Sequence, residues 1–349
     1  MDFDAFFEGV IGQIMAPVDP TESLFYLYIV SALLLSFVTY IWFSGTKENQ
    51  RPEGISKGFF GYVFDRDVWL HRSAIQDYIF FLANTIIYSG IIAHFLISGH
   101  MVFEAFGFLF DAVFGVRTTS AFPPSPVSAV GFTLATILAI DLAIFLTHYL
   151  QHRVTLLWHF HSVHHSAEVL TIMTVFRQHP VDLFITGTLL VVLYQLAFAG
   201  FTYLTMAEPS AISIAGVNIV LFTFFLVGYN LRHSHIWLNY PRWLSYILIS
   251  PAQHQTHHSV ADKHFDRNFG FIFAIWDWLF GTLYVPQGYE KLEFGLSHEE
   301  PNPFNSVTEI YLKPFRLAWN EIPPVFRKRS VKLLICAAGL GGFAVHQFF

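Results

Sequence analysis

The sequence carries little charge, a single cysteine and no excess of basic residues. Asp, Glu, Lys and Arg together make up 13% of its 349 residues, whereas soluble domains carry about 25%. The one cysteine, Cys336, excludes an intrachain disulfide and every zinc or iron–sulfur site that needs several cysteines. A formal net charge of −6 excludes nucleic acid as the expected partner, because proteins that bind nucleic acids present basic patches.

Apolar residues are abundant instead. They make up 54% of the chain, and phenylalanine alone contributes 40 residues. So much apolar surface cannot be hidden in water, but a bilayer accepts it. Five segments have the roughly 20 apolar residues that crossing a bilayer requires. They are Leu24–Phe43, Tyr78–Ser98, Val127–Leu150, Leu183–Ala207 and Ala211–Leu231.

Basic residues predict the orientation of these spans. If the N-terminus lies outside and the five spans alternate, every Lys and Arg except Arg117 falls inside, which is 18 of the 19. A sixth segment, Val331–Phe349, is a weaker candidate span because Lys332 and three glycines interrupt it. We therefore expect an integral, multi-pass membrane protein whose basic loops lie in the cytosol.

Three regions of the chain differ in content. Residues 1–125 are expected to form an N-terminal membrane region with two spans, and residues 126–290 a catalytic region that holds most of the histidines. Residues 291–349 are expected to form a cytosolic tail that ends in the sixth candidate span.

Histidine is the second unusual feature, with 18 residues against 19 Lys and Arg. Nine histidines form a pair four residues apart, two triplets that each fall within five residues, and one single residue between the triplets. On a helix, residues three and four apart share a face, so each cluster presents several imidazoles to one point. The nine are His148, His152, His161, His164, His165, His233, His254, His257 and His258.

These clusters lie at the predicted cytosolic ends of spans or in predicted cytosolic segments, so they can converge on one centre. Imidazole is a ligand for iron, zinc, copper and nickel. One structural zinc takes about four ligands, so nine histidines exceed one metal ion and fit two. We therefore predict an all-α, polytopic helical membrane protein whose cytosolic, histidine-rich helical cap holds a di-metal site.

The other histidines are scattered. Solvated or simply hydrogen-bonded side chains are expected at His71, His94, His100, His298 and His346. The same holds for His159, His235 and His264, with a hydrogen bond to a ligand histidine as the alternative. A metal transporter or sensor is the alternative function from another class, although its histidines would be expected inside the spans.

The flanking residues resemble those of a known family, the fatty acid hydroxylase/sterol desaturase superfamily. Residues 157–166 (LWHFHSVHHS) look like its central box, and residues 174–180 (TVFRQHP) are similar to its Arg-x-His-Pro element. Residues 233–236 (HSHI) resemble a His-Ser-Asn-Ile element in which His235 replaces the usual Asn. Residues 268–270 (NFG) and 276–282 (WDWLFGT) are similar to its closing signature.

The resemblance implies a non-haem centre of two iron ions, held by the nine patterned histidines. It makes His179 a tenth ligand or a residue that hydrogen-bonds to a ligand, and it leaves the role of His235 open.

Three further polar residues are candidates for the surroundings of the centre. Asp141 lies two helical turns before His148 and is interpreted as orienting a ligand imidazole, with a polar helix–helix contact as the alternative. Asn268 and Asp277 are expected either to orient ligand imidazoles or to cap and close turns.

The resemblance also implies a reaction: O2-dependent hydroxylation or desaturation of a sterol-like or fatty acyl lipid. An ether-lipid or aminolipid monooxygenase of the same superfamily is the alternative. The C–H bond of a lipid tail offers no handle to an acid, a base or a nucleophile, so the cofactor has to supply the chemistry. The lipid can enter from the bilayer. Electrons are expected from a separate donor protein of the ferredoxin, rubredoxin or cytochrome type.

Overall fold

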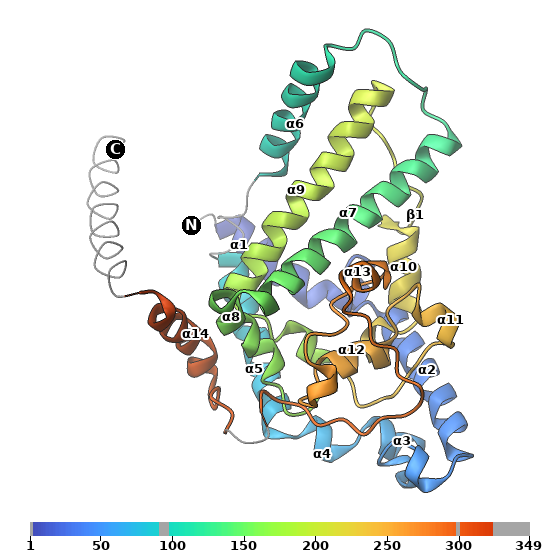
Figure 1. Cartoon of the computed structure of the whole chain (residues 1–349), viewed down its shortest axis with the longest axis vertical. Coiled ribbons are helices and arrows are strands. Elements are labelled where there is room, and N and C mark those ends of the chain that lie inside the picture. Colours follow the sequence, from blue (N-terminus) through green and yellow to red (C-terminus); the bar gives the residue numbers. More distant parts are fainter. Residues whose placement is uncertain (1–2, 91–97, 298–300, 324–349) are drawn as a thin grey trace.

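The computed structural model describes residues 3–90, 98–297 and 301–323 (Figure 1). Regular structure in these ranges is helical, apart from one antiparallel hairpin that pairs Ser213 with Asn218 and Ile214 with Val217. The predicted all-α class therefore holds for the described residues except at this hairpin. In chain order the elements are α1 (Phe3–Met15), α2 (Tyr26–Ser44), α3 (Gly58–Val63), α4 (Arg66–Trp69), α5 (Arg72–Gly90), α6 (Gly99–Phe114), α7 (Pro126–Arg153), α8 (Thr155–His165), α9 (Pro180–Thr205), β1 (Ser213–Ile214), β2 (Val217–Asn218), α10 (Ile219–Leu226), α11 (Arg242–Ser245), α12 (Pro251–His257), α13 (Ile275–Phe280) and α14 (Val307–Glu321).

Three described helices, α2, α7 and α9, are long and apolar enough to cross a bilayer. They confirm, by length and composition, the predicted spans Leu24–Phe43, Val127–Leu150 and Leu183–Ala207. Helices α7 and α9 pack against each other, and α6 runs along α9 (Figure 1). The short helices α8, α12 and α13 gather near the C-terminal end of α7 (Figure 1).

A capping residue followed by proline starts both α7 and α9. Ser125 precedes Pro126, and its hydroxyl accepts a hydrogen bond at 3.2 Å from the backbone N–H three residues later. His179 precedes Pro180, and its Nδ1 accepts from the N–H of Val181 at 3.1 Å. Proline suits the first helical position because the N–H that it lacks would have no helical partner there. These pairs therefore determine where the two helices begin.

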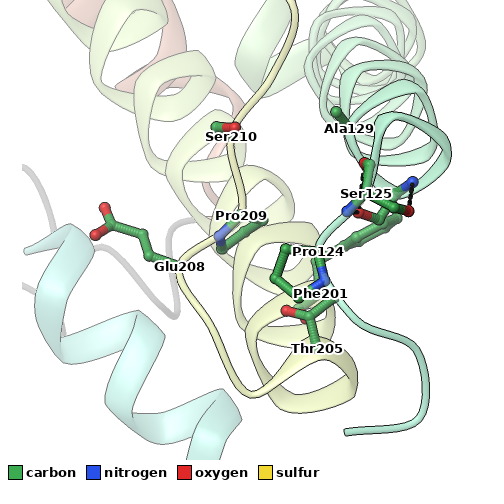
Figure 2. A pocket seen from close by; sticks show the side chains of 9 residues that line it. Pro124, Ser125, Ala129, Phe201, Thr205, Glu208, Pro209 and Ser210 are labelled. Atoms are coloured by element: carbon green, nitrogen blue, oxygen red, sulfur yellow. Dashed lines mark hydrogen bonds between the residues drawn. The ribbon is translucent and has the colours of Figure 1, made fainter.

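The end of this helix pair farthest from the short helices holds a small pocket of about 70 Å³. Figure 2 shows that its lining comes from the start of α7, the last turns of α9 and the loop after α9. Arg117 lies at the same end, with its guanidinium 5.0 Å from the ring centre of Tyr203 in the last turn of α9.

The prediction that Ala211–Leu231 is a membrane-spanning helix is wrong. The segment forms the β1–β2 hairpin, the eight-residue helix α10 and a 3-10 turn at Tyr229–Leu231. Eight helical residues rise only about 12 Å, whereas the hydrocarbon core is about 30 Å thick. Ala215 and Gly216 turn the hairpin at φ 50° and 82°, and Gly228 at φ 127° follows α10. The segment is apolar because much of it packs on α2 and α7.

Two other predicted spans extend outside the described residues. The described part of Tyr78–Ser98 belongs to α5, which begins earlier, at Arg72, and residues 91–97 lie outside the described ranges. Val331–Phe349 lies wholly outside them. Both segments stay predictions as spans.

A buried ion pair fixes α8 against α5. Arg177 donates from Nη1 to Oδ1 of Asp77 at 2.7 Å, and both side chains are fully buried. Arg177 also donates from Nε to the carbonyl oxygen of Val163 in α8 at 2.9 Å. The hydroxyl of Thr174 donates to the second oxygen of Asp77 at 2.7 Å. Arg177 therefore links α5 to α8, and removing either partner of the ion pair would leave a buried charge.

Candidate metal centre

All nine patterned histidines come together in the structure, although they lie as far as 110 residues apart in the sequence. They form two groups, and within each group one ring nitrogen per residue lies within 4.8 Å of the others. The five-histidine group consists of His148, His152, His161, His165 and His257. The four-histidine group consists of His164, His233, His254 and His258.

The two helices that carry a histidine triplet, α8 and α12, each serve both groups. In α8, His161 and His165 lie four residues apart and face the five-histidine group, whereas His164 faces the other group. At α12, His257 joins the five-histidine group while His254 and His258 join the four-histidine group. Because residues four apart share a helical face, a triplet at this spacing can divide its imidazoles between two adjacent sites.

The Nε2 atoms within each group are unusually close. In the five-histidine group, Nε2 of His165 lies 3.1 Å from Nε2 of His152 and 3.1 Å from that of His257. In the four-histidine group, Nε2 of His233 lies 2.9 Å from that of His254 and 3.2 Å from that of His164. Several nitrogens therefore converge on one point in each group.

Backbone carbonyls determine which ring nitrogen faces that point in two cases. Nδ1 of His148 donates to the carbonyl oxygen of Phe269 at 2.9 Å, and Nδ1 of His257 donates to that of Arg267 at 2.7 Å. A neutral imidazole carries one proton, so Nε2 of each ring presents a lone pair to the five-histidine group. This arrangement is typical of metal-ligating histidines, whose other nitrogen donates to a carbonyl or carboxylate.

In the two groups, burial lowers the pKa of each of the seven histidines that lie outside α7, which favours the neutral imidazole. Burial lowers the pKa of His161 to about 3. For the others, burial lowers the pKa well below the ordinary value of 6.5, and neighbouring charged or imidazole groups lower it further. They are His164, His165, His233, His254, His257 and His258. Only neutral imidazole binds a metal ion.

These observations fit two bound metal cations. Nε2 of His148 and Nε2 of His161 are buried without a hydrogen-bond partner among the described residues. Buried polar atoms are normally paired, and lone pairs that face one another at about 3 Å repel unless a cation lies between them. The chemistry of the donors therefore suits metal ions such as iron, with five histidines available to one and four to the other.

Acidic and basic residues that the sequence did not point to surround the groups. Oδ2 of Asp182 lies 3.6 Å from Nδ1 of His161, and Oδ1 of Asp266 lies 3.5 Å from Nδ1 of His152. Beside the four-histidine group, Arg232 donates from Nη2 to Nδ1 of His254 at 2.8 Å. Arg232 could have been suspected, because it precedes His233. Asp182 and Asp266 have no such signal, since only the fold brings them near the histidines.

Among the described residues, Asp141 makes no hydrogen bond to a histidine, so its contacts fit the alternative of a polar contact between elements and not an orienting bond to a ligand imidazole. Its Oδ1 accepts from the backbone N–H of Ile272 at 2.6 Å, and its Oδ2 accepts from the indole N–H of Trp276 at 2.7 Å. The carboxylate therefore anchors to α7 the segment that carries Phe269, whose carbonyl accepts from His148. Its effect on the ligands is indirect.

Asn268 and Asp277 close the same segment, as the turn-forming alternative expected. Oδ1 and Oδ2 of Asp277 accept from the backbone N–H groups of Phe269 and Gly270 at 2.8 and 2.7 Å. Nδ2 of Asn268 donates to the carbonyl oxygen of Gln253 in α12 at 2.9 Å. Neither side chain makes a hydrogen bond to an imidazole in the described residues, but both hold the carbonyls that orient His148 and His257.

His179 and His235 lie outside both groups. The Nδ1 of His179 caps α9, and its Nε2 donates to the carbonyl oxygen of Tyr311 at 3.1 Å. Nε2 of His235 donates to the carbonyl oxygen of Tyr62 at 2.6 Å. These bonds use both ring nitrogens of His179, so it is not placed as a tenth ligand. Among the scattered histidines, His264 contacts Glu290 at 3.2 Å and joins neither group.

Two cavities reach the histidines. The α7–α9 cavity, of about 270 Å³, is lined by residues of α7 and α9 together with ligand candidates of both groups. The α8 cavity, of about 370 Å³, is lined by residues of α8 and of the segments 257–266 and 295–296. The residues that line the α7–α9 cavity without belonging to a histidine group are Ile144, Thr147, Gln151, Val175, Gln178, Asp182, Thr186, Tyr229, Arg232, Phe269, Gly270 and Phe271.

Comparison with known proteins finds a family match for the histidine-bearing region. Residues 133–282 match the family model described as fatty acid hydroxylase. The chain is 28% identical over 190 residues to an alkylglycerol monooxygenase of Xenopus tropicalis, which covers 53% of this chain and 37% of the relative. It is 26% identical over 199 residues to the alkylglycerol monooxygenase of Homo sapiens, covering 56% and 40%.

A bacterial relative is more distant. The ornithine lipid hydroxylase of Rhizobium tropici is 24% identical over 157 residues, covering 45% of this chain and 43% of the relative. The chain thus spans about two fifths of the length of the curated relatives that it matches. No solved structure matches the chain.

Proposed function

The histidine-bearing region of this chain belongs to the fatty acid hydroxylase superfamily, and on this premise we propose that the chain is a membrane-bound lipid monooxygenase. One observation carries the proposal: two groups of histidines lie beside a cavity formed between two span-length helices. A lipid can approach such a cavity from the bilayer, and metal ions held by the histidines can meet it there.

We propose hydroxylation as the reaction, with an ether lipid or an aminolipid as the first substrate classes to test. The relatives are called alkylglycerol monooxygenase and ornithine lipid hydroxylase, which favours insertion of oxygen over desaturation and favours these lipids over sterols. In a balanced form, R–H, O2, two electrons and two protons give R–OH and water.

The proposed cofactor is a pair of iron ions, one in each histidine group. When bound, they would supply the oxidising chemistry that an unactivated C–H bond requires. The chain holds the ligand rings through the carbonyls of Phe269 and Arg267. Seven of the nine histidines, all those outside α7, are buried, which limits their contact with bulk water. Both electrons are proposed to come from a separate ferredoxin, rubredoxin or cytochrome.

We propose that the histidine groups face the cytosol and that the N-terminus lies outside. The basic residues support this sidedness without the fifth predicted span. Arg117 lies at the end of α7 and α9 away from the histidines, whereas Arg153, Arg177 and Arg232 lie at the histidine end, and basic residues favour the cytosolic side. Glycosylation or cysteine-labelling tags in the loop around Arg117 and in the tail after α14 would report opposite sides. Labelling of both positions from the same side would overturn the orientation.

Lipid analysis by mass spectrometry tests the reaction. Cells with the gene should convert supplied 1-O-hexadecylglycerol or an ornithine lipid to a product with a gain of 16 mass units. Hydroxylation next to an ether oxygen gives a hemiacetal, so hexadecanal and glycerol count as the same outcome. His161→Ala and His257→Ala variants should form no product. Full product formation by both variants would refute the proposal, and a loss of 2 mass units would replace hydroxylation by desaturation.

The alternative function, a metal transporter or sensor, makes a different prediction. Purified oxygenase should retain about two tightly bound metal ions per chain and consume O2 only with lipid and a reductant. A transporter would move metal ions across liposome membranes and alter no lipid. Zinc in the purified protein would fit either function, because overproduced histidine sites can take the wrong metal.

A further inference from the structure

The α7–α9 cavity contains buried polar atoms that the metal groups do not explain. Nε2 of Gln151 and both carboxylate oxygens of Asp182 are buried and lack a hydrogen-bond partner among the described residues. Each residue is only 3% exposed, and both line this cavity. An unpaired buried polar group costs about 1–3 kcal/mol, so such atoms on the wall of one cavity indicate a polar ligand.

The two side chains complement a hydroxyl group. The amide nitrogen of Gln151 is a donor, and the carboxyl oxygens of Asp182 can accept. A hydroxyl can accept from the first and donate to the second at the same time. An alkyl chain can do neither, so a site built only for a hydrocarbon tail would leave all three atoms unpaired. Ile144, Val175 and Phe271 add apolar surface to the same wall, which suits the chain that follows.

The position of Asp182 limits where the hydroxyl lies in the substrate. Its Oδ2 is 3.6 Å from Nδ1 of His161, too long for a hydrogen bond. The other nitrogen of that ring, Nε2, is free among the described residues and belongs to the five-histidine group. One imidazole ring therefore separates Asp182 from this group, so a hydroxyl bound there lies close to the carbon to be oxidised.

We propose that Gln151 and Asp182 form a hydroxyl-binding subsite that presents the polar head of a hydroxyl-bearing lipid to the five-histidine group. This inference rests on the proposed lipid monooxygenase function. It identifies the substrate class as lipids with a free hydroxyl near the oxidised carbon. Gln151 and Asp182 act as specificity residues that bind the substrate without holding the metal.

Paired lipids test the subsite. The probes are 1-O-hexadecylglycerol and its 2,3-di-O-methyl ether, which has the same chain but no free hydroxyl. Equilibrium binding to the full-length chain in detergent is measured both with and without metal, and kcat and KM with the metal-loaded protein. The wild type should bind the free-hydroxyl lipid about tenfold more tightly, since only that lipid can donate to Asp182 while it accepts from Gln151.

Variants assign the preference to the two residues. Gln151→Met keeps the side-chain length but removes the donor, and it should reduce the preference towards about twofold through KM. Asp182→Leu should do the same, and Asp182→Asn, which keeps an acceptor, should restore part of it. Thr147→Val is the matched control on the same helix and cavity, because the Thr147 hydroxyl already donates to the carbonyl oxygen of Ala143 at 2.9 Å. It should leave the ratio between the probes unchanged.

The failure modes are distinct. Equal binding of the two probes by a wild type that oxidises a lipid would overturn the subsite and leave the proposed function standing; it would mean that these atoms hold water. The subsite would also be overturned if Gln151→Met and Asp182→Leu lost bound metal but kept the preference for the free-hydroxyl lipid. The two residues would then position the metal-binding histidines and not the substrate. A chain that prefers the free-hydroxyl lipid yet oxidises no lipid would sink only the proposed function.

Discussion

The two histidine groups share their ligand type and their burial but differ in the charge beside them. Asp182 and Asp266 lie within 4 Å of Nδ1 atoms in the five-histidine group. The four-histidine group has instead the guanidinium of Arg232 at 2.8 Å from Nδ1 of His254. Negative charge near a cation site favours the cation and positive charge opposes it. Two sites built from identical ligands therefore need not bind a metal ion with equal affinity.

The largest expected effect comes from removing one ligand of each group. Titration of the metal-free protein with Fe(II), followed by metal content, should show a tight phase and a phase at least about tenfold weaker. His257→Ala should remove the tight phase and His258→Ala the weak one, and either change should lower lipid oxidation at least about 100-fold. If His258→Ala removed the tight phase instead, the proposed ranking of the two groups would be reversed.

Loss of the Asp277 carboxylate should affect the groups unequally. Asp277→Ala leaves the buried N–H groups of Phe269 and Gly270 unpaired, which costs about 3 kcal/mol of unfolding free energy. The carbonyl of Phe269 would then move away from His148, so metal affinity should fall about 10- to 100-fold in the five-histidine group. The weaker phase of the titration, which reports the four-histidine group, should not change.

Asp277→Asn is the control for this change, because it keeps one acceptor oxygen. It should lose less unfolding free energy and less metal affinity than Asp277→Ala. Chemical denaturation measures stability and the two-phase titration measures affinity. An equal loss of affinity in both groups would show that the segment 267–277 supports the whole centre and does not distinguish its halves.

Both groups contain buried histidines with a lowered pKa, and lowering the pH tests this shared property. Burial lowers the pKa of His165 and His258 in the folded protein below the value of about 6.5 in the unfolded chain. Below about pH 6.5 the unfolded chain therefore takes up protons that the folded chain refuses, so the free energy of unfolding falls as the pH falls. Between pH 7.5 and 5.5 each such histidine should cost the metal-free protein about 1 kcal/mol.

Thermal unfolding of the metal-free protein at several pH values measures this loss. His165→Gln and His258→Gln should each reduce the pH dependence by the same amount, because one titrating imidazole is removed from either group. A melting temperature that is constant between pH 7.5 and 5.5 would contradict the burial of neutral histidines that the structure shows.

The sequence predicted the gathering of the nine histidines because their spacing is a local property of helices. Residues three and four apart share a face wherever the helix lies, so the clusters could be read without a fold. The division into two groups could not, because it depends on how α8 and α12 are rotated against each other. Asp182 and Asp266 could not be predicted for the same reason. Each comes near a histidine only through the packing of segments that are distant in the sequence.

Hydropathy predicted some of the membrane spans correctly and one of them wrongly. Hydropathy identified α2, α7 and α9 correctly, because long apolar helices in these positions have few alternatives. It failed at Ala211–Leu231, where the apolar residues pack against protein and positive-φ residues turn the chain. Hydropathy measures whether a segment avoids water, and a bilayer and a protein interior satisfy that condition equally.

The smallest expected effect belongs to Asp266, and it tests the comparison most directly. Asp266→Asn suits the left-handed backbone there, at φ 57°, and removes the charge beside His152 together with the ion pair of Asp266 to Arg153 at 2.8 Å. Because Asp266 is 39% exposed, solvent screens it, and affinity in the five-histidine group should fall about tenfold at most. Asp262→Asn, the same change at an exposed position of the same segment, should leave the titration unchanged. Equal titrations for the two variants would mean that the buried Asp182, not Asp266, makes the groups different.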